Sequence, residues 1–482
     1  MLKNGILQKF YIGGEWRLAG SSDLHPIFDP VTEAAIDSIP WATEAEVGEA
    51  VAAARGAFGS WSTTPKQERV DCLRRLIEVY ERRLEEMGRV ISQDMGAPID
   101  LAVQAQAASG LGHLKVFAST LETMAFERPF SANMPQHRIH REPIGVAALI
   151  TPWNWPMNQI CLKVGAALAA GCTMVLKPSE IAPMSAALFA EFIHEAGIPS
   201  GVFNLVHGDG AHTGAALAGH PDVSVVSFTG STRAGREISR LAADSLRRVT
   251  LELGGKSPNL IFADCDLPGR IRHGVSACFS NTGQSCDAPT RMLVEREVYE
   301  QAVQLAAQVA RETRVDRPDL PGNHIGPLVS EAQFHKVQEL IRKGVAEGAR
   351  LVAGGPGRPE GMDRGWFARP TVFADVAQDM TIWREEIFGP VLSITPFDSQ
   401  EEAIDLANDT LYGLAAYVQT ASPERIRRLV PRLRAGIVRM NGSSRAPGSP
   451  FGGYKLSGNG REGGTWGIEE FLEVKSVAGW PA

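Results

Sequence analysis

Short apolar runs alternate with segments of helical periodicity between about residues 145 and 253. The runs are continuous rather than interleaved with polar residues, which is typical of strands buried on both faces. Strands are expected at 145–150, 173–176, 202–206, 223–228 and 249–253, and helices at 157–170, 184–196, 211–219 and 232–243. This alternation predicts a parallel sheet covered on both faces, a doubly wound arrangement that binds ligands beyond the carboxyl ends of its strands.

A second alternation begins near residue 267 and predicts another α/β unit. Its expected strands are 291–294, 351–352, 391–396, 414–419 and 436–440, and its expected helices are 268–281, 297–312, 331–347, 400–408 and 423–433. The chain before residue 125 is mainly helical in pattern, and a capping box of Thr43 and Glu46 predicts where one helix begins.

Segment 125–142 differs from both units because it is polar and alternating on both sides of a turn. An isolated hairpin is only marginally stable in water, so this one needs a partner surface and is a candidate oligomer arm. An ordinary surface hairpin is the alternative. Residues 471–477 also alternate like a strand, and we consider pairing with a neighbour's sheet or arm.

Composition excludes several classes of protein. The 482 residues are 44% apolar and 21% charged, which rules out intrinsic disorder. A net charge of −7 offers no basic surface for nucleic acid or an anionic membrane. No apolar run is long enough to span a bilayer and the N-terminus lacks a secretory signal, so we expect a cytoplasmic protein. Six cysteines without a CxxC pair indicate neither a disulfide framework nor a metal site.

One cysteine is nevertheless a candidate nucleophile. Cys286 follows an expected helix in the polar, glycine-containing loop 281–287, whereas the other five lie in apolar, helical or acidic surroundings. Reactive thiols occupy polar, partly accessible loops, so Cys286 is the cysteine that we expect to react.

Two polar residues lie where expected strands end. Glu252 precedes a Gly-Gly turn, where burial would raise its pKa toward that of a useful general base; a carboxylate turned to solvent is the alternative. Asn154 lies between two tryptophans and two prolines, and a rigid amide donor suits an oxyanion hole.

Two further turns could bind a nucleotide. Gly230 and Gly235 flank the start of a helix after a strand, where free backbone N–H groups can bind phosphate, although a plain turn has the same pattern. Lys177 and Glu180 follow the second strand of the first sheet and could hold ribose hydroxyls.

Taken together, seven motifs in order resemble the aldehyde dehydrogenase superfamily across nearly the whole chain. They are PWNWP at 152–156, KPSE at 177–180, FTGST at 228–232, LELGGKSP at 251–258, NTGQSC at 281–286, EEIFGPV at 385–391 and PFGGYKLSGNGRE at 450–462. The resemblance implies an α/β fold of three parts. They are a Rossmann-type cofactor domain (1–124 and 143–253), an α/β catalytic domain (254–456) and a small β oligomerisation arm (125–142 and 457–482). A homodimer or homotetramer is implied as well.

The resemblance also implies roles for individual residues. Cys286 would attack the aldehyde carbonyl, with Asn154 and the Cys286 backbone N–H as the oxyanion hole. Glu252 would activate the water that hydrolyses the thioester, and Lys163 and Glu462 match a proton path away from it. The implied cofactor contacts are Ile150, Thr151, Pro152, Trp153, Lys177, Glu180, Gly210, Gly214, Phe228, Gly230, Ser231, Leu253, Glu386 and Phe388.

NAD is the expected cofactor. The resemblance assigns Lys177 and Glu180 to the adenosine ribose, where a carboxylate repels the 2′-phosphate of NADP. Lys177 could pair with that phosphate, but the carboxylate favours NAD over NADP.

The implied reaction is oxidation of an aldehyde to the carboxylic acid. Family members that transfer the acyl group to CoA usually lack the residue matching Glu252, so hydrolysis is favoured over acyl transfer. A non-enzymatic member would be expected to have lost Cys286, Glu252 or Asn154, and all three are present.

The resemblance also bears on the substrate. It assigns the acyl pocket to Trp155, Gln159, Leu162, Ser285, Asp287 and the segment 443–449. Leu162 stands where succinate-semialdehyde dehydrogenases carry arginine, which disfavours a small semialdehyde, although Arg445 could meet an anionic tail. Segment 443–449 is light in aromatics, which favours an open pocket for a bulky or aromatic aldehyde.

Overall fold

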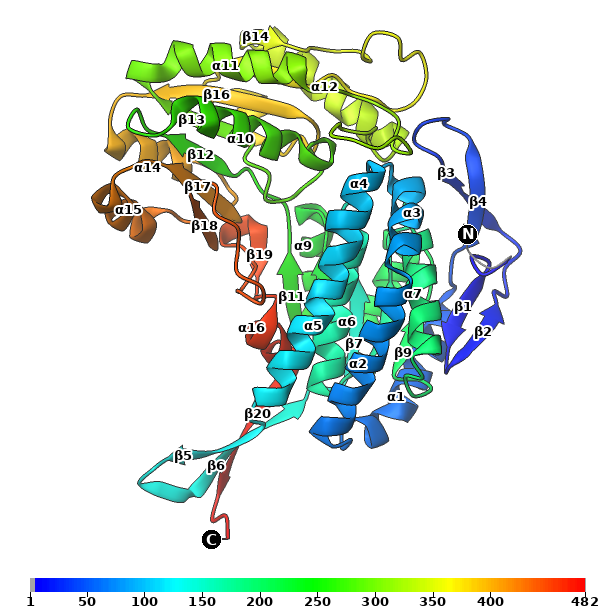
Figure 1. Ribbon diagram of the computed structural model, residues 1–482. Helices are drawn as coiled ribbons and strands as arrows, with labels where there is room; N and C mark the ends of the chain where they lie inside the picture. Colours follow the sequence, from blue (N-terminus) through cyan, green and yellow to red (C-terminus); the bar gives the residue numbers. More distant parts are fainter. Residues whose placement is uncertain (1–4, 482) are drawn as a thin grey trace.

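The computed structural model describes residues 5–481, which form two large sheets, a small projecting sheet and a separate two-stranded sheet (Figure 1). The first large sheet has the strand order β19-β11-β10-β7-β8-β9-β1-β2. Its strands are β1 Lys9–Ile12, β2 Glu15–Leu18, β7 Val146–Ile150, β8 Thr173–Lys177, β9 Phe203–Leu205, β10 Val225–Thr229, β11 Arg248–Glu252 and β19 Gly458–Asn459. The five central strands, β11 to β9 in that order, are parallel. The order is that of a Rossmann fold, with the direction of winding reversing between β7 and β10.

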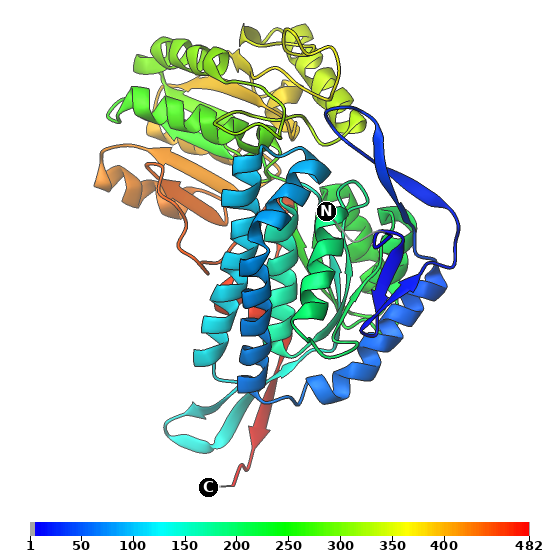
Figure 2. The same ribbon diagram turned by 45° about the vertical axis from the view of Figure 1, so that its right-hand side comes forward.

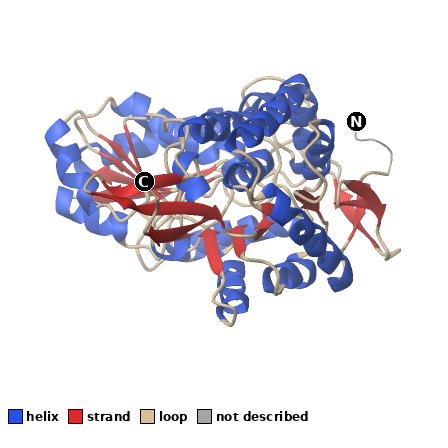
Figure 3. Cartoon of the chain, turned by 90° about the horizontal axis from the view of Figure 1, so that it is seen from below, coloured by secondary structure: helices blue, strands red, loops and turns tan. Residues whose placement is uncertain are grey.

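Alternate residues of the central strands enter two different cores, which explains the continuous apolar runs. In β7, Ala147 and Leu149 join a core with helices α2, α3, α5, α6 and α7. Val146, Ala148 and Ile150 face the opposite core with α1, α8 and α9. Helices therefore cover both faces of the strands (Figure 3).

Helices make up much of the rest of the chain. The α-helices are α1 Glu44–Trp61, α2 Lys66–Arg82, α3 Leu84–Met95, α4 Ile99–Leu101, α5 Ala108–Thr123, α6 Pro156–Ala170, α7 Met184–Glu195, α8 Ala215–Gly219, α9 Thr232–Ala243, α10 Leu267–Phe279, α11 Tyr299–Glu312, α12 Glu331–Ala346, α13 Thr381–Arg384, α14 Gln400–Asn408, α15 Pro423–Leu429 and α16 Gly464–Glu469. Two π-helices, η1 Ala102–Ala107 and η2 Gly210–Gly214, and four short 3₁₀-helices, η3 Ser280–Gly283, η4 Arg296–Val298, η5 Val430–Arg432 and η6 Lys455–Ser457, complete the set in the described residues. The predicted capping box of Thr43 and Glu46 is present at the start of α1.

The second large sheet has the order β14-β15-β16-β13-β12-β17-β18, and only β14 is antiparallel to its neighbour. Its strands are β12 Pro258–Ile261, β13 Arg291–Glu295, β14 Arg350–Ala353, β15 Thr371–Ala374, β16 Val391–Phe397, β17 Ala415–Gln419 and β18 Ile437–Met440. Separate cores lie on its two faces, one with α10 and α11 and the other with α12 to α15.

Two hairpins extend from these sheets. The strands β3 Leu24–Phe28 and β4 Ala35–Pro40 form the first, dark blue in Figure 2, and its turn reaches the second unit. There Glu33 Oε1 accepts a hydrogen bond from Gly365 N at 2.8 Å and pairs with Arg358 at 2.9 Å. The second hairpin, β5 Glu127–Ser131 and β6 Met134–Pro143, is the expected arm and projects below the molecule (Figure 1).

The C-terminal strand β20 Leu472–Ala478 pairs with β6 of the same chain, from Leu472 opposite Pro143 to Ala478 opposite His137. The preceding residues do not belong to the arm sheet. Strand β19 pairs with β11 in the first large sheet, and α16 packs on α5 and α6. Of the segment 457–482 predicted as part of the arm, β20 therefore pairs with the hairpin, whereas β19 and α16 lie against the first unit.

Candidate active site

A cavity of about 210 Å³ lies at the carboxyl ends of β7 and β10, where the winding of the first sheet reverses. It is lined by Pro152, Trp153, Asn154, Gln159, Thr229, Gly230, Ser231, Leu253, Gly254, Cys286, Gln333, Lys336, Glu386 and Phe388. Most of the residues that the motifs singled out for the nucleophile, the amide donor, the phosphate turn and the nicotinamide end are thus brought together.

The loop before Cys286 has an unusual backbone. Asn281, Thr282 and Gly283 have φ angles of 51°, 57° and 72°, which lie in the left-handed region. This conformation is unfavourable for residues other than glycine, and especially for a β-branched threonine. A Cβ on Gly283 would lie 2.0 Å from the Gly389 carbonyl oxygen, so glycine is required there. Strained backbone of this kind persists only where the surroundings hold it in place.

Buried side chains hold this turn. Asn281 Nδ2 donates to the Asn154 carbonyl oxygen at 2.8 Å, and its Oδ1 accepts from Gln106 Nε2 at 2.9 Å. Thr282 Oγ1 donates to Gly326 O at 3.0 Å. The turn is therefore bonded to the segment before α6 through Asn154, to η1 through Gln106, and to the loop at Gly326. These bonds hold the loop that carries Cys286 in place.

The Asn154 side chain points at the same loop. It is buried, and its Nδ2 donates to the Gln284 carbonyl oxygen at 3.0 Å, two residues before the cysteine. Trp155, next in the chain, donates from Nε1 to Ser285 Oγ at 2.8 Å. These two bonds hold the amide beside the thiol, as an oxyanion donor requires.

The surroundings of Cys286 oppose ionisation of its thiol. Burial raises the pKa of Cys286 well above its usual value, and the charges of Asp287, Glu386 and Glu252 raise it further. These surroundings therefore oppose the low pKa that is common for reactive cysteines.

Glu252 is buried at the end of β11 and faces a second, smaller space. That space, about 10 Å³ and large enough for about one water molecule, is lined by Glu252 and Glu462 among others. Neither Glu252 carboxylate oxygen has a hydrogen-bond partner within the described residues. Burial raises its pKa well above the usual range, and the charge of Glu462 adds to the rise. The solvent-facing alternative for Glu252 is therefore wrong.

Lys163 and Glu462 form an ion pair behind this space. Lys163 Nζ lies 2.5 Å from Glu462 Oε1 and 3.1 Å from Ser227 Oγ, and both charged residues are buried. Glu462 also lines the small space that Glu252 faces, so this ion pair and the Glu252 carboxylate border the same space.

The residues expected at the ribose lie at the neighbouring strand end. Lys177 ends β8, directly beside Ile150 of β7, which in turn pairs with Phe228 of β10. Thr151 N donates to Lys177 O at 3.2 Å. Lys177 Nζ donates to Gly208 O at 2.6 Å and pairs with Glu180 at 3.3 Å. Burial lowers the pKa of Lys177, although its ion pair with Glu180 opposes this.

Gly210 and Gly214 lie near this lysine rather than in the 210 Å³ cavity. They begin and end the π-helix η2, which Asp209 caps by accepting from the backbone N–H of His212 and Thr213. A Cβ on Gly214 would lie 3.7 Å from Lys177 Cδ. The helix predicted over 211–219 is therefore divided into η2 and α8.

The residues expected at the phosphate and at the nicotinamide, among them Gly230, Ser231, Glu386 and Phe388, line the same cavity. Ser231 caps α9 by accepting from Ala234 N at 3.3 Å, and Gly230 and Ser231, which precede this helix, line the cavity. Glu386 Oε1 accepts from Gly255 N at 2.9 Å. The rings of Trp153 and Phe388 meet edge to face at 5.4 Å, and both line the cavity.

Sequence reasoning missed Thr229, Gly254, Gln333 and Lys336, and placed Gln159 in the acyl pocket only. Gln333 and Lys336 lie one turn apart on α12 of the second unit, and Gln333 Nε2 donates to Phe388 O at 2.7 Å. Polar residues at this spacing on an amphipathic helix are ordinarily solvated. The amphipathic pattern itself gave no signal that this end of α12 reaches the first sheet.

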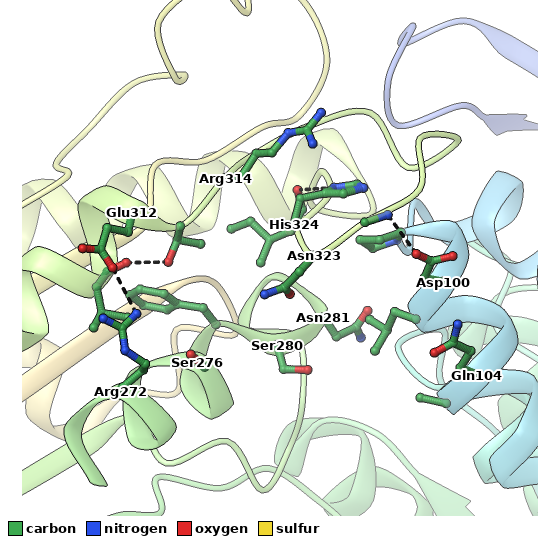
Figure 4. A pocket seen from close by; sticks show the side chains of 18 residues that line it. Asp100, Gln104, Arg272, Ser276, Ser280, Asn281, Glu312, Arg314, Asn323 and His324 are labelled. Atoms are coloured by element: carbon green, nitrogen blue, oxygen red, sulfur yellow. Dashed lines mark hydrogen bonds and ion pairs between the residues drawn. The ribbon is translucent and has the colours of Figure 1, made fainter. Parts of the chain in front are cut away.

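A larger cavity of about 660 Å³ lies elsewhere, between η1, α10 and the loop 313–325 (Figure 4). Most of its charged groups are already paired. Arg272 meets Glu312 at 3.0 Å, and Asp100 accepts from Gly322 N at 2.8 Å. It holds no cysteine and no unpaired acid or base that would act on a substrate, so its size alone does not make it the reactive site.

A Rossmann crevice that holds a loop cysteine and a buried amide donor defines a dinucleotide-dependent oxidoreductase with a thiol nucleophile. Residues 16–477 match the model of the aldehyde dehydrogenase family. The chain belongs to this family.

Relatives cover nearly the full length of the chain. A 3-succinoylsemialdehyde-pyridine dehydrogenase from a Pseudomonas species is 50% identical over 98% of both chains. The crystal structure of an aldehyde dehydrogenase from Bartonella henselae is 51% identical, with a TM-score of 0.97 over 98% of this chain and 99% of that one. A mutant of aldehyde dehydrogenase C from Pseudomonas syringae, solved with NAD⁺ and octanal, is 47% identical, with a TM-score of 0.98 over 100% of this chain and 98% of that one.

Neither a membrane span nor a metal cluster was found in residues 5–481. No helix there combines the length and apolar character needed to cross a membrane. No group of three or more histidine, cysteine, aspartate or glutamate side chains there is arranged to hold a metal ion.

Proposed function

We propose that the protein oxidises a bulky or aromatic aldehyde to the carboxylic acid, with NAD as the hydride acceptor. The observation that carries the proposal is that Cys286 and Asn154 share one cavity with the phosphate turn at Gly230 and Ser231. Thiol, amide donor and dinucleotide crevice together supply the parts that acyl chemistry on an aldehyde needs.

The chain's residues divide the reaction into two steps. The Cys286 thiol releases its proton to water and its sulfur attacks the aldehyde carbon; we assign Asn154 Nδ2 and the Cys286 backbone N–H to the oxygen that becomes negative. Loss of a hydride from this thiohemiacetal leaves a thioester on Cys286. Water then attacks the thioester, Glu252 takes its proton, and the acid is released with the thiol restored. We assign removal of that proton to the Glu462 and Lys163 pair.

The residues present fit NAD. When bound, it supplies the acceptor for the hydride. We assign its ribose hydroxyls to Lys177 and Glu180, at the end of β8. The free N–H groups at the start of α9 suit a pyrophosphate, and Glu386 and Phe388 line the opposite end of the cavity. The Glu180 carboxylate disfavours NADP, and the Pseudomonas syringae relative was solved with NAD⁺.

The relatives support the substrate class. One, at 50% identity, is named for a semialdehyde that carries a pyridine ring, and another was solved with octanal. Both aldehydes are longer than a small dicarboxylic semialdehyde. We propose further that the protein works in the cytoplasm, where thiols stay reduced, because catalysis requires Cys286 as a free thiol.

The test measures NADH absorbance with a panel of aliphatic, aromatic and semialdehyde substrates. Cys286→Ala should abolish NADH formation. Glu252→Gln should still form about one NADH per active site in a burst, and then turn over about 10²- to 10⁴-fold more slowly, because only hydrolysis needs the base. The matched control is Cys265→Ala, which removes a partly exposed cysteine outside the cavity and should keep full activity. Activity that survives Cys286→Ala would refute the proposal.

A further inference from the structure

The small space that Glu252 faces has carboxyl groups from three residues along its walls. Glu252, Glu462 and Glu470 all line it. Its volume of about 10 Å³ suits about one water molecule. The remaining lining residues are Leu162, Ser227, Thr250, Asn459, Arg461, Gly467 and Phe471. Three carboxyl groups around one space raise the question of how protons enter and leave it.

Glu252 and Glu462 are both enclosed by the protein. They are 4% and 8% exposed. Both carboxylate oxygens of Glu252, and Oε2 of Glu462, are buried without a hydrogen-bond partner in the part of the chain that the structure describes. The other Glu462 oxygen is bonded to Lys163, which is buried as well. Unpaired buried oxygens are costly, so these are suited to a water molecule in the space that they share.

The main cavity does not provide Glu252 with a way to return its proton to solvent. Glu252 is not among the residues that line that cavity. In the proposed reaction the main cavity also holds the cofactor and the acyl group. A proton that Glu252 takes from the attacking water therefore leaves through the small space. The pair of Glu462 and Lys163 borders this space, but both of its members are buried, so a further group is needed to reach bulk water.

Glu470 is the third carboxyl residue of the space, and it is only half-buried. It directly follows α16, and its Oε1 accepts a hydrogen bond from Arg461 N at 2.9 Å. Its backbone oxygen accepts from Arg248 Nη1 at 3.2 Å. These bonds hold Glu470 at the edge of the space, so that it lines the interior and is also accessible from outside.

The charges around Glu470 link it to the other two carboxyl groups. Burial raises the pKa of Glu470 and the charge of Glu462 adds to the rise, while the hydrogen bond from Arg461 N and the charges of Arg248 and Arg461 oppose it. The charge of Glu470 in turn raises the pKa of Glu252. A group that relays protons works best with a pKa close to the working pH, and the shift of Glu470 is in that direction.

Building on the proposed function, we propose that Glu470 passes the proton of Glu252 to bulk water after each hydrolysis of the thioester. The Glu252 carboxyl gives its proton to the water molecule that fits the space, and that water gives a proton to the Glu470 carboxylate. Glu470 then releases the proton to solvent, and no other bond changes. Glu470 touches neither substrate nor cofactor, so its contribution is confined to the step in which the base is regenerated.

The test measures hydrolysis itself, so that slow release of NADH cannot hide it. The acyl group on Cys286 is followed by acid quench and mass spectrometry during a single turnover of the best aldehyde in the panel. Glu470→Gln keeps an acceptor for Arg461 N, and should form the thioester at the native rate but hydrolyse it at least about tenfold more slowly. Glu470→Asp should keep part of the native rate. In Glu470→Ala, added formate should restore hydrolysis in proportion to its concentration, because a small base takes over the relay.

The matched control is Glu469→Gln, which neutralises the adjacent carboxylate. Glu469 pairs with Arg141 at 2.8 Å and does not line the space, so hydrolysis should stay native. Native hydrolysis in Glu470→Gln would overturn the inference. A loss that extends to formation of the thioester, or that formate does not relieve in Glu470→Ala, indicates a purely structural role and overturns it too. If the native enzyme forms no NADH with any aldehyde in the panel, the proposed function itself fails.

Discussion

At the scale of the residue, the surroundings of Cys286 oppose the ionised form of the thiol that its proposed role requires. The nucleophile is needed as a thiolate, yet burial and three carboxylates keep its proton on. Asp287 is the closest of these in sequence, and after burial its charge contributes most to the raised pKa of Cys286. Its position therefore sets how much of the thiol is ionised at a given pH.

Asp287→Asn should make Cys286 more reactive toward alkylation. Removing a neighbouring negative charge stabilises the thiolate relative to the thiol, so the pKa of Cys286 falls. The rate of inactivation by iodoacetamide at neutral pH should rise by up to about tenfold, and its pH midpoint should move to lower pH. Asp266→Asn, which changes the charge beside Cys265 instead, should leave both unchanged. An unaltered profile in Asp287→Asn would show that this charge has no influence on the thiol.

Single residues were predictable from sequence where they stood in polar or glycine-containing turns between helices and strands. Asn154, Gly230 and Cys286 could be found in this way, because turn chemistry is local. Gln333 and Lys336 could not, because on a single helix they are indistinguishable from solvated surface residues. Whether Glu252 is solvated or buried is decided by β19 and the turn at Gly452, which are distant in sequence.

At the scale of the element, periodicity predicted the first sheet well. Each strand expected between 145 and 253 is present to within two residues. The strands β12 and β15 were missed. Each has only four residues. In addition, β12 begins with a proline and only five residues separate it from the end of β11. The pattern therefore predicted one strand where the chain forms two, in different sheets. The N-terminal strands β2 and β3 were missed because most of their residues are exposed.

The turn 450–453 packs against Glu252, the general base that we propose, and Gly452 within it is the residue closest to that carboxylate. Its φ is +153°, and a Cβ there would lie 2.6 Å from Glu252 Oε1 and 2.7 Å from Gly460 O. Gly452→Ala should therefore displace the Glu252 carboxylate and slow hydrolysis of the thioester. We expect a burst of NADH followed by turnover at least about tenfold slower than native, as a general base out of position would give.

Gly361→Ala is the matched control for this substitution. Gly361 also has a positive φ, +79°, but a Cβ there would meet nothing within 4 Å. It should bear the same type of backbone strain without affecting turnover. Normal steady-state kinetics in Gly452→Ala would mean that the turn does not set the position of Glu252.

At the scale of the whole molecule, the site depends on how the two large sheets meet. The first contributes the carboxyl ends of its strands, at Thr229 and Leu253. The second contributes segments that precede its strands, with Cys286 before β13 and Phe388 before β16. The rule for open parallel sheets therefore applies to the first sheet only. No pattern within either unit shows that the two sheets face each other across the cavity. The motifs therefore indicated which residues to consider, but not that both sheets would contribute to one site.

The projecting arm is the feature of the whole molecule that most needs a second copy. It carries Phe130 and Val474 with 58% and 67% of their surface exposed, and large apolar side chains on a protruding sheet indicate an interface.

We expect sedimentation equilibrium to give a mass of two or four chains. Phe130→Glu combined with Val474→Lys should lower the measured mass toward that of a single chain. Each substitution places a charge where an apolar side chain would be buried in the interface, which disfavours association. Leu18→Lys is the control, since Leu18 is 73% exposed on β2 at the far side of the molecule, and its mass should stay native (Figure 1). A native protein that sediments as one chain would rule out the arm as an oligomer contact, and the exposed face would then need another partner.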